Sequence, residues 1–364
     1  MALAKKLGLL ISVVGLGLVM ARAGEQPRVV NAQLTTRPAA SGLQREFQAL
    51  VQNQTAPAWV GYAVPAVPGE HSMCCCDTGR YGRMRGQCSL EGDHGTNFNS
   101  NDSKQANLEG PEYFWVLWRI ADKRAGKIRM FSADCELNAG GLPLIWFTDV
   151  KPSESVALLS TYVRSSEDGE REGKGKDLGS SALAAIALTA DPAADGALDG
   201  FIAPGQPEHL RQDVSFWMGS ARGRHGFETL QRLLKSDPDD RFREHAIFGL
   251  TVTHEPEAIP TLIDIAKHDN AAHVRGQALF WLAQKAGQRA TQAITEAIDN
   301  DPETDVKKRA VFALSQLPRD QGVPRLIQVA RSNRNYEVRK QAMFWLGQSN
   351  DPRALSFFED VLLR

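Results

Sequence analysis

Hydrophobic residues in the second half of the chain recur with a period of 32 positions. Each copy opens on an apolar residue, with a small or apolar residue four positions later and an apolar one eight positions later, as in Val274, Ala278 and Leu282. These offsets lie on one face of an α-helix, so each copy predicts an amphipathic helix. The opening residues are Leu178, Leu210, Phe242, Val274, Val306 and Val338.

A second apolar series with the same period follows a break in every copy. Breaks such as His254-Glu255-Pro256 place a proline after polar residues, which is typical of a helix start. The second series consists of Leu198, Leu230, Leu262, Ile294, Leu326 and Phe358. Because so short a helix–turn–helix–turn unit cannot bury its own apolar face, the six copies predict an α-solenoid over residues 178–364.

The last copy carries a family resemblance. Its sequence VRKQAMFWLGQSNDPRALSFFEDVL, from Val338 to Leu362, resembles the short HEAT-like repeat of bilin-lyase subunits and many exported bacterial proteins. The resemblance covers about residues 178–364 and implies stacked helix pairs. Ankyrin and tetratricopeptide repeats have similar periods, but their signatures are absent.

Some HEAT-like proteins, of the deoxyhypusine hydroxylase type, hold a di-iron centre on paired His-Glu dipeptides of successive repeats. Here His254-Glu255 occurs once, in a break between helices, and Glu244-His245 has the reverse order. A metal needs several converging ligands. We therefore expect neither a metal nor another cofactor in the repeats.

The N-terminal half has a different pattern. Residues 1–23 resemble a signal peptide: two lysines, an apolar stretch too short to span a membrane comfortably, and the small-residue site Ala21-Arg22-Ala23. Residues 24–42 have no apolar period and predict a flexible lead. Since no second apolar span follows, we expect a periplasmic or secreted protein without a transmembrane segment after cleavage. An uncleaved anchor is the alternative.

Residues 43–164 predict a small β-rich domain. A charged loop from Ala121 to Gly126 joins two of its predicted strands, and a helix is expected to begin at Pro152. The predicted strands are residues 59–64, 113–120, 127–131 and 142–147. Residues 165–177 are mostly polar or glycine and predict a linker. The expected fold class is α+β, with a disulfide-containing β-rich domain before an all-α solenoid of six 32-residue helix pairs.

The five cysteines all lie in the predicted β-rich domain: Cys74, Cys75, Cys76, Cys88 and Cys135. Export places them in an oxidising compartment, which favours disulfides. Adjacent cysteines rarely bond each other, so the triplet is expected to reach Cys88 and Cys135, and the odd count leaves a thiol free or intermolecular. A metal site formed by the triplet with His71 or His94 is the alternative, although the C-x-x-C spacing is absent.

Charge and motifs narrow the classes of function. The formal net charge is −1 for the chain, and residues 178–364 hold 22 Lys and Arg against 24 Asp and Glu, or −2. A nucleic-acid-binding solenoid would show a basic excess, so we expect no nucleic-acid partner. The sequence has no glycine-rich phosphate loop, G-x-S-x-G or H-E-x-x-H motif, and we predict no catalytic residue.

A phenylalanine series runs along the first helix of each copy, six positions after its opening residue: Phe216, Phe248, Phe280, Phe312 and Phe344. This position points about 160° away from the small residue at the helix centre. The rings could pack between adjacent first helices, or they could form an exposed apolar surface for a partner. The next position alternates between large and small, as Trp217, Gly249, Trp281, Ala313 and Trp345, which favours packing.

A basic series follows each opening residue directly: Arg211, Arg243, Arg275, Lys307 and Arg339. We expect each cation to pair with the Asp or Asn that closes the preceding unit. The alternative is a basic ridge for an acidic partner. Arg243, Arg275 and Arg339 therefore join the five phenylalanines as candidate partner-binding residues.

The favoured function is a non-catalytic exported scaffold that binds a protein partner through its solenoid. One alternative is a HEAT-like lyase or isomerase subunit acting on a bound small molecule, which rests on fold analogy. Another is an envelope redox or stress sensor, in which the cysteine-containing domain reports to the solenoid.

Overall fold

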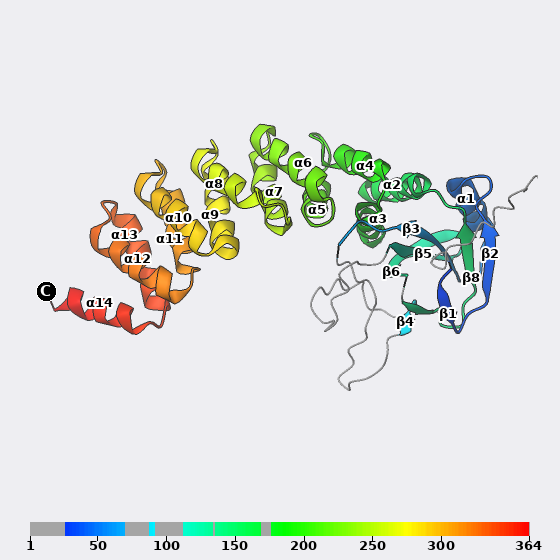
Figure 1. The fold of residues 1–364 in the computed structure, drawn as a ribbon, viewed down its shortest axis with the longest axis horizontal. Coiled ribbons are helices and arrows are strands. Elements are labelled where there is room, and N and C mark those ends of the chain that lie inside the picture. Colours follow the sequence, from blue (N-terminus) through cyan, green and yellow to red (C-terminus); the bar gives the residue numbers. More distant parts are fainter. Residues whose placement is uncertain (1–25, 70–86, 92–111, 134, 169–175, 364) are drawn as a thin grey trace, which may run out of the picture.

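The computed structural model of the protein describes residues 26–69, 87–91, 112–133, 135–168 and 176–363. It forms an elongated arc with two parts (Figure 1). A sheet region lies at one end, and a stack of helices runs from it to α14 at the other end. The α-solenoid and the β-rich N-terminal region are both confirmed at this level.

Two sheets make up the N-terminal region. The larger is five-stranded, with β2 and β3 parallel to β8, and with β3, β5 and β6 antiparallel. Its strands, in spatial order, are β2 (Leu34–Pro38), β8 (Leu144–Thr148), β3 (Ala58–Pro65), β5 (Tyr113–Ala121) and β6 (Arg124–Ser132). The smaller is parallel, with β1 (Arg28–Val30), β7 (Glu136–Asn138) and β4 (Gln87–Ser89).

Successive side chains of a strand point to opposite faces of the larger sheet, and both faces are covered. On one face Trp118 packs against Phe47 of α1 (Leu43–Asn53), with ring centroids 4.8 Å apart, and α2 (Pro152–Asp168) covers the same core. On the other face Trp115 and Trp146 meet edge to face at 5.2 Å, next to Leu137 of the smaller sheet.

Within the described residues the solenoid consists of six helix pairs, and each first helix begins one full sequence period after the one before it. The first helices are α3 (Lys176–Leu188), α5 (Glu208–Ala221), α7 (Asp240–Val252), α9 (Ala272–Ala286), α11 (Thr304–Ser315) and α13 (Tyr336–Gln348). The second helices are α4 (Pro192–Ile202), α6 (Gly223–Ser236), α8 (Ala258–His268), α10 (Gln288–Asn300), α12 (Arg319–Ser332) and α14 (Pro352–Leu362).

Burial follows the two apolar series. The residues at the opening position and at offsets four and eight are buried in every first helix except at Leu178, which is half-buried. The second series is buried as far as Leu326. In the last unit Phe357 is buried, whereas the predicted Phe358 is only half-buried.

The first helix of the solenoid is attached directly to the sheet region. Val67 donates its backbone N–H to Leu188 O at 2.9 Å, and Ala190 donates to Pro65 O at 2.9 Å. The buried core is continuous from the sheet through the last repeat. Helices α2 and α3 extend into both ends of the predicted linker, residues 165–177, while residues 169–175 lie outside the described part.

Two local expectations are wrong. The predicted flexible lead, residues 24–42, contains strands β1 and β2. The side chains of β2 are mostly exposed, so no apolar period marks it, and backbone pairing with β8 holds it in place. The predicted loop 121–126 is a two-residue turn at Asp122 and Lys123, with φ of 52° and 60°. Positive φ at both positions matches the right-handed twist of a hairpin.

Several sequence predictions lie outside the described residues, namely the signal peptide and the cysteine triplet at positions 74–76 with His71 and His94. Cys88 belongs to β4, and Cys135 is buried just before β7, the strand that pairs with β4. The disulfide framework stays a prediction. None of the described helices is both long and apolar enough to cross a membrane.

Candidate interaction surface

Eight aromatic rings form a continuous row across five successive first helices, which we call the aromatic ladder. It starts on α5 and ends on α13, and its rings follow one another as Trp217, Phe216, Phe248, Trp281, Phe280, Phe312, Trp345 and Phe344. The centroids of successive rings are 4.9 to 6.0 Å apart. Contacts at these distances are favourable aromatic pairs. The phenylalanine series therefore packs from repeat to repeat.

The same rings also contact solvent. Phe344 is 53% exposed and Phe248 is 36% exposed, and the other three phenylalanines of the ladder are half-buried. None of the five is fully buried. Packing between repeats and exposure to solvent therefore occur together: the rings stack on each other, and they also present an apolar surface.

The tryptophans recur in every second repeat because alternate repeats leave room for them. Trp281 of α9 lies over Phe248 of α7, and Trp345 of α13 lies over Phe312 of α11. At the same offset α7 carries Gly249, where an added Cβ would lie 2.4 Å from the Ser215 carbonyl oxygen of α5. Backbone contact at this position excludes a side chain. The predicted alternation of large and small residues is packing.

The ladder borders two grooves. Equivalent residues of the two grooves lie two repeats apart. The first has a volume of about 440 Å³ and is lined by Phe216, Trp217, Phe248 and Trp281, with the polar residues Asp213, Glu244 and His245. The second has a volume of about 510 Å³ and is lined by Phe312 and Trp345, with Asp305, Lys308, Arg309 and Gln341. Each groove combines an aromatic wall with a few charged side chains, which is typical of binding sites.

Arg309 reaches between the two grooves. Its Nη1 is 3.8 Å from Glu244 Oε1, two repeats away, and 3.4 Å from the carbonyl oxygen of His273. It crosses α9 at Gly276, where an added Cβ would lie 2.3 Å from Arg309 Cδ. The glycine thus makes room for the arginine. Since Arg309 is 47% exposed, its ion pair with Glu244 is weak and open to exchange.

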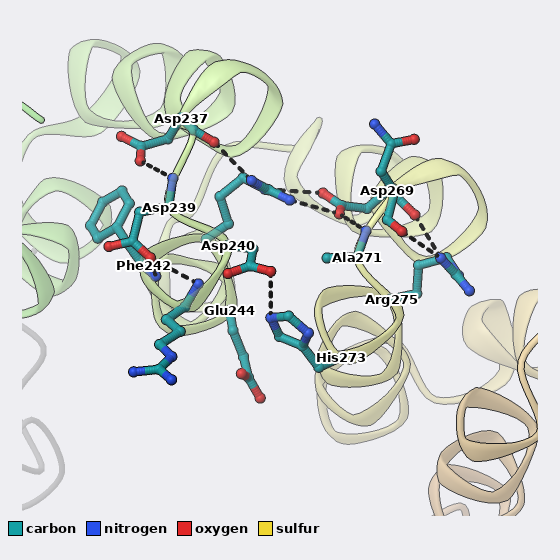
Figure 2. Close-up of polar contacts among 12 residues, drawn as sticks. Asp237, Asp239, Asp240, Phe242, Glu244, Asp269, Ala271, His273 and Arg275 are labelled. Atoms are coloured by element: carbon teal, nitrogen blue, oxygen red, sulfur yellow. Dashed lines mark hydrogen bonds and ion pairs between the residues drawn. The ribbon is translucent and has the colours of Figure 1, made fainter.

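Three residues of the basic series form internal ion pairs, and their carboxylate partners lie in the opposite direction along the chain from the expected ones. Each of the first three cations binds the aspartate that follows the second helix of its own unit. Arg211 pairs with Asp237, Arg243 with Asp269 and Arg275 with Asp301. Figure 2 shows Asp237, Asp269 and Arg275 in succession along the stack.

The preceding unit supplies backbone oxygens instead. Arg243 Nη1 donates to Asp237 O at 2.7 Å, and Arg275 Nη1 donates to Asp269 O at 2.8 Å. Each arginine therefore joins two consecutive turns. The direction of pairing has a physical cause. Each carboxylate already accepts a backbone N–H of the turn that follows it, as Asp269 does from Ala271. In this position the carboxylate faces the arginine of its own unit.

This geometry reduces the value of the arginines as partner-binding candidates. The side chains of Arg243 and Arg275 are 12% and 8% exposed, so little of either guanidinium can reach a partner. Arg339 is half-buried and donates to Asn333 O at 2.8 Å. Sequence reasoning missed Arg309, whose role depends on a glycine in another repeat.

Titratable side chains are scattered in the described part of the solenoid. His254 and Glu255 lie in the turn between α7 and α8, and His273 Nε2 lies 3.5 Å from Asp240 Oδ2. Among the residues that the structure describes, no three His, Cys, Asp or Glu side chains are grouped to hold a metal ion.

Comparisons with known proteins agree with the repeat pattern. A family model of HEAT repeats matches residues 227–315 and 291–364. No curated protein sequence matches the chain. Solved structures that are similar include human deoxyhypusine hydroxylase in complex with glycerol, at 15% identity over 57% of this chain and 90% of that one, with a TM-score of 0.30.

Two further similar structures are of bacterial proteins. The CpcE–CpcF complex of phycocyanin lyase from a Nostoc species matches at 19% identity over 58% of this chain and 81% of that one, with a TM-score of 0.29. The Escherichia coli protein YibA matches at 15% identity over 58% and 80%, with a TM-score of 0.33. Because all three TM-scores are low, the identification of HEAT repeats rests on the match to the family model.

Proposed function

Because residues 227–364 match HEAT repeats, we propose that this protein is a non-catalytic exported scaffold whose aromatic ladder binds a partner protein. A stack of repeats presents an extended surface, along which each unit can contribute a contact. The sheet region, which is joined to the first repeat, closes one end of the stack.

The aromatic ladder is the observation that carries this proposal. Its rings are held in place by neighbouring rings, yet Phe248 and Phe344 are more than one-third exposed. Rigid aromatic side chains lose little conformational entropy on binding and dominate the energetics of many interfaces. A connected apolar surface across five helices costs free energy in water, which a bound partner would recover.

The decisive experiment is a pair of matched variants. Phe280→Ser with Phe312→Ser removes two stacked rings of the ladder, whose centroids are 5.8 Å apart. Leu355→Ser with Val361→Ser removes two side chains that are 62% and 48% exposed on α14. Both proteins, and the wild type, carry a photo-crosslinking amino acid at His245, which lines the first groove.

We expect the wild type and the α14 variant to form the same crosslinked product in a periplasmic extract, and the ladder variant to lose it. A crosslinker at the exposed Arg232 of α6 should give no such product. Equal crosslinking by all three proteins would disprove the role of the ladder. Far-UV circular dichroism checks that each variant remains folded.

Export is tested separately. The proposal places the mature protein in the periplasm or outside the cell, with its N-terminus at Gly24 after removal of residues 1–23. The intact mass of a C-terminally tagged protein from the periplasmic fraction should match this product. A full-length mass, with the protein confined to the cytoplasm, would exclude an exported scaffold.

The alternative function, a lyase or isomerase subunit, draws on the size of the grooves. Volumes of about 440 and 510 Å³ fall within the usual range of small-molecule sites. If a small molecule is the natural ligand, protein purified from its own cells should release an absorbing compound on denaturation. The ladder variant should then carry less of it than the α14 variant.

A further inference from the structure

The two grooves share one arrangement of a phenylalanine and a tryptophan, and this arrangement suggests what kind of partner they bind. Resting on the proposed function, we infer that the ladder binds one extended segment of a partner protein, with two apolar side chains about six residues apart. We further infer that the basic end of this segment lies on α5 and α7, and its acidic end on α11 and α13.

The equivalence of the grooves is visible in their aromatic walls. Phe248 and Trp281 have ring centroids 4.9 Å apart at an interplanar angle of 37°. Phe312 and Trp345, two repeats further along the chain, show the same 4.9 Å and 37°. Two matching ring pairs on one stack favour a ligand with two similar apolar anchors.

The spacing of the anchors follows from helix packing. Neighbouring helix axes lie about 8–10 Å apart, so a shift of two repeats amounts to about 20 Å. An extended chain advances about 3.3 Å per residue, so about six residues cover this distance. An even number places both anchors on the same side of the segment.

The charges beside the grooves differ in sign. The first groove contains Asp213 and Glu244, and no Lys or Arg lines it. In the second groove Lys308 pairs with Asp305 at 3.3 Å, so Arg309 gives this groove its basic excess. Charges at the rim of an interface determine orientation more than affinity. A segment that is basic at one end and acidic at the other is therefore aligned in one direction.

Arg309 can take part in this alignment. It lies between the grooves, in a 3.8 Å ion pair with Glu244 that is partly open to water. An acidic side chain of the segment can replace Glu244 as its partner. Glu244 is then free to pair with the basic end of the same segment.

Synthetic peptides test the spacing without altering the protein. The reference peptide is fluorescein-labelled KKLSGSGSLEE, with leucines six residues apart; two others have leucines three and nine residues apart. Fluorescence anisotropy with the full chain lacking residues 1–23 gives each Kd. We expect the reference peptide to bind about 10-fold more tightly than the others, because its second anchor binds intramolecularly. Equal affinities would overturn the spacing.

The direction is tested by photo-crosslinking from either end of the reference peptide. A benzophenone at the lysine end should label α5 or α7, and one at the glutamate end should label α11 or α13. The reverse result, or the same labelling from both ends, would overturn the charge argument. Arg309→Glu should reduce the preference for one direction, whereas the control Arg232→Glu on α6 should not.

The two levels of proposal fail differently. If the ladder variant loses its natural partner while the peptides bind without any spacing preference, the scaffold function stands and the inferred segment is wrong. If the natural partner binds the ladder variant normally, the proposed function itself is wrong.

Discussion

The buried ion pair between Arg275 and Asp301 makes the middle of the solenoid sensitive to the loss of either partner. Arg275 Nε and Nη2 donate to the two carboxylate oxygens of Asp301 at 2.8 and 2.9 Å. The side chain of Arg275 is 8% exposed and that of Asp301 is 5% exposed. This hydrogen bond to Asp301 is the main reason why the pKa of Arg275 is raised. Arg275→Met should therefore leave a buried carboxylate without its cation.

The size of the effect follows from this burial. Removal of one partner from a buried ion pair costs about 3–5 kcal/mol. Asp301 still accepts the backbone N–H of Glu303 at 2.9 Å, so the lower end, about 3 kcal/mol, is expected. The exposed pair of Lys267 and Glu296 is the control, and Lys267→Met should cost about 1 kcal/mol or less.

The following repeat has a neutral residue in place of Asp301. In the following repeat Lys307 and Asn333 occupy the equivalent positions, and Asn333 accepts the N–H of Asn335 as Asp301 accepts that of Glu303. Arg275→Met combined with Asp301→Asn removes both charges, so no buried charge is left unpaired. The double variant should lose about 1 kcal/mol or less, because replacing both partners of a buried pair is often close to neutral.

Hydrogen exchange is the appropriate assay, because a repeat protein opens locally. In the Arg275→Met variant, amides of α9 to α11 should exchange about 100-fold faster, since about 1.4 kcal/mol corresponds to a factor of ten. The double variant and the Lys267 control should stay within about 10-fold of the wild type. Equal protection in the single and double variants would refute the ion-pair argument.

The remaining predictions concern packing, pH and thiols. Ala278→Asp should cost several kcal/mol in chemical denaturation, because Ala278 is fully buried and a carboxylate there has no partner; a loss of less than about 1 kcal/mol would contradict the buried seam. Gly249→Ala should cost about 1–3 kcal/mol, because its Cβ would lie 2.4 Å from a backbone oxygen of α5, and an unchanged midpoint would show that α5 and α7 can separate freely. Asp351 caps α14, and its hydrogen bond with Arg353 lowers its pKa from 3.8 to about 2. The carboxylate therefore stabilises the folded state above pH 4 and loses this effect as the pH falls towards 2, so the advantage of the wild type over Asp351→Asn in protecting α14 amides should vanish there; an advantage independent of pH would be inconsistent with this. Denatured, unreduced periplasmic protein should show fewer than two of its five cysteines as free thiols, and labelling of four or five would argue for the metal site instead.

The periodic part of the fold could be predicted because every repeat meets the same surroundings. A residue such as Ala246 or Ala310 is buried between copies of its own unit, so one local pattern determines both the helix and its packing. Sheet-region elements without such repetition were harder to predict. The sequence did not predict helix α1. Leu43, Phe47 and Leu50 have helical spacing and are buried, but this pattern is short and lies within the predicted β-rich domain.

The candidate site was predictable in its residues but not in its arrangement. The sequence placed five phenylalanines and three tryptophans at fixed offsets, and all eight belong to the ladder. It did not predict that Arg275 pairs with Asp301, the aspartate after the second helix of its own unit. Nor did it predict that Arg309 crosses α9 at Gly276 to approach Glu244. The backbone geometry of the stack decides both contacts, because their partners are far apart in the sequence.

By itself, then, the sequence determined the period, the two helices of each unit and the face of each helix that is buried, because these depend on spacing within one repeat. Tertiary structure decided whether the rings are covered, how the charged side chains pair and how the first repeat joins the sheet. These features depend on the distance between residues such as Phe248 and Trp281, one repeat apart, or Arg309 and Glu244, two repeats apart. That distance is set by how closely successive helices approach, and small residues such as Gly249 control the approach through contacts that no single repeat contains.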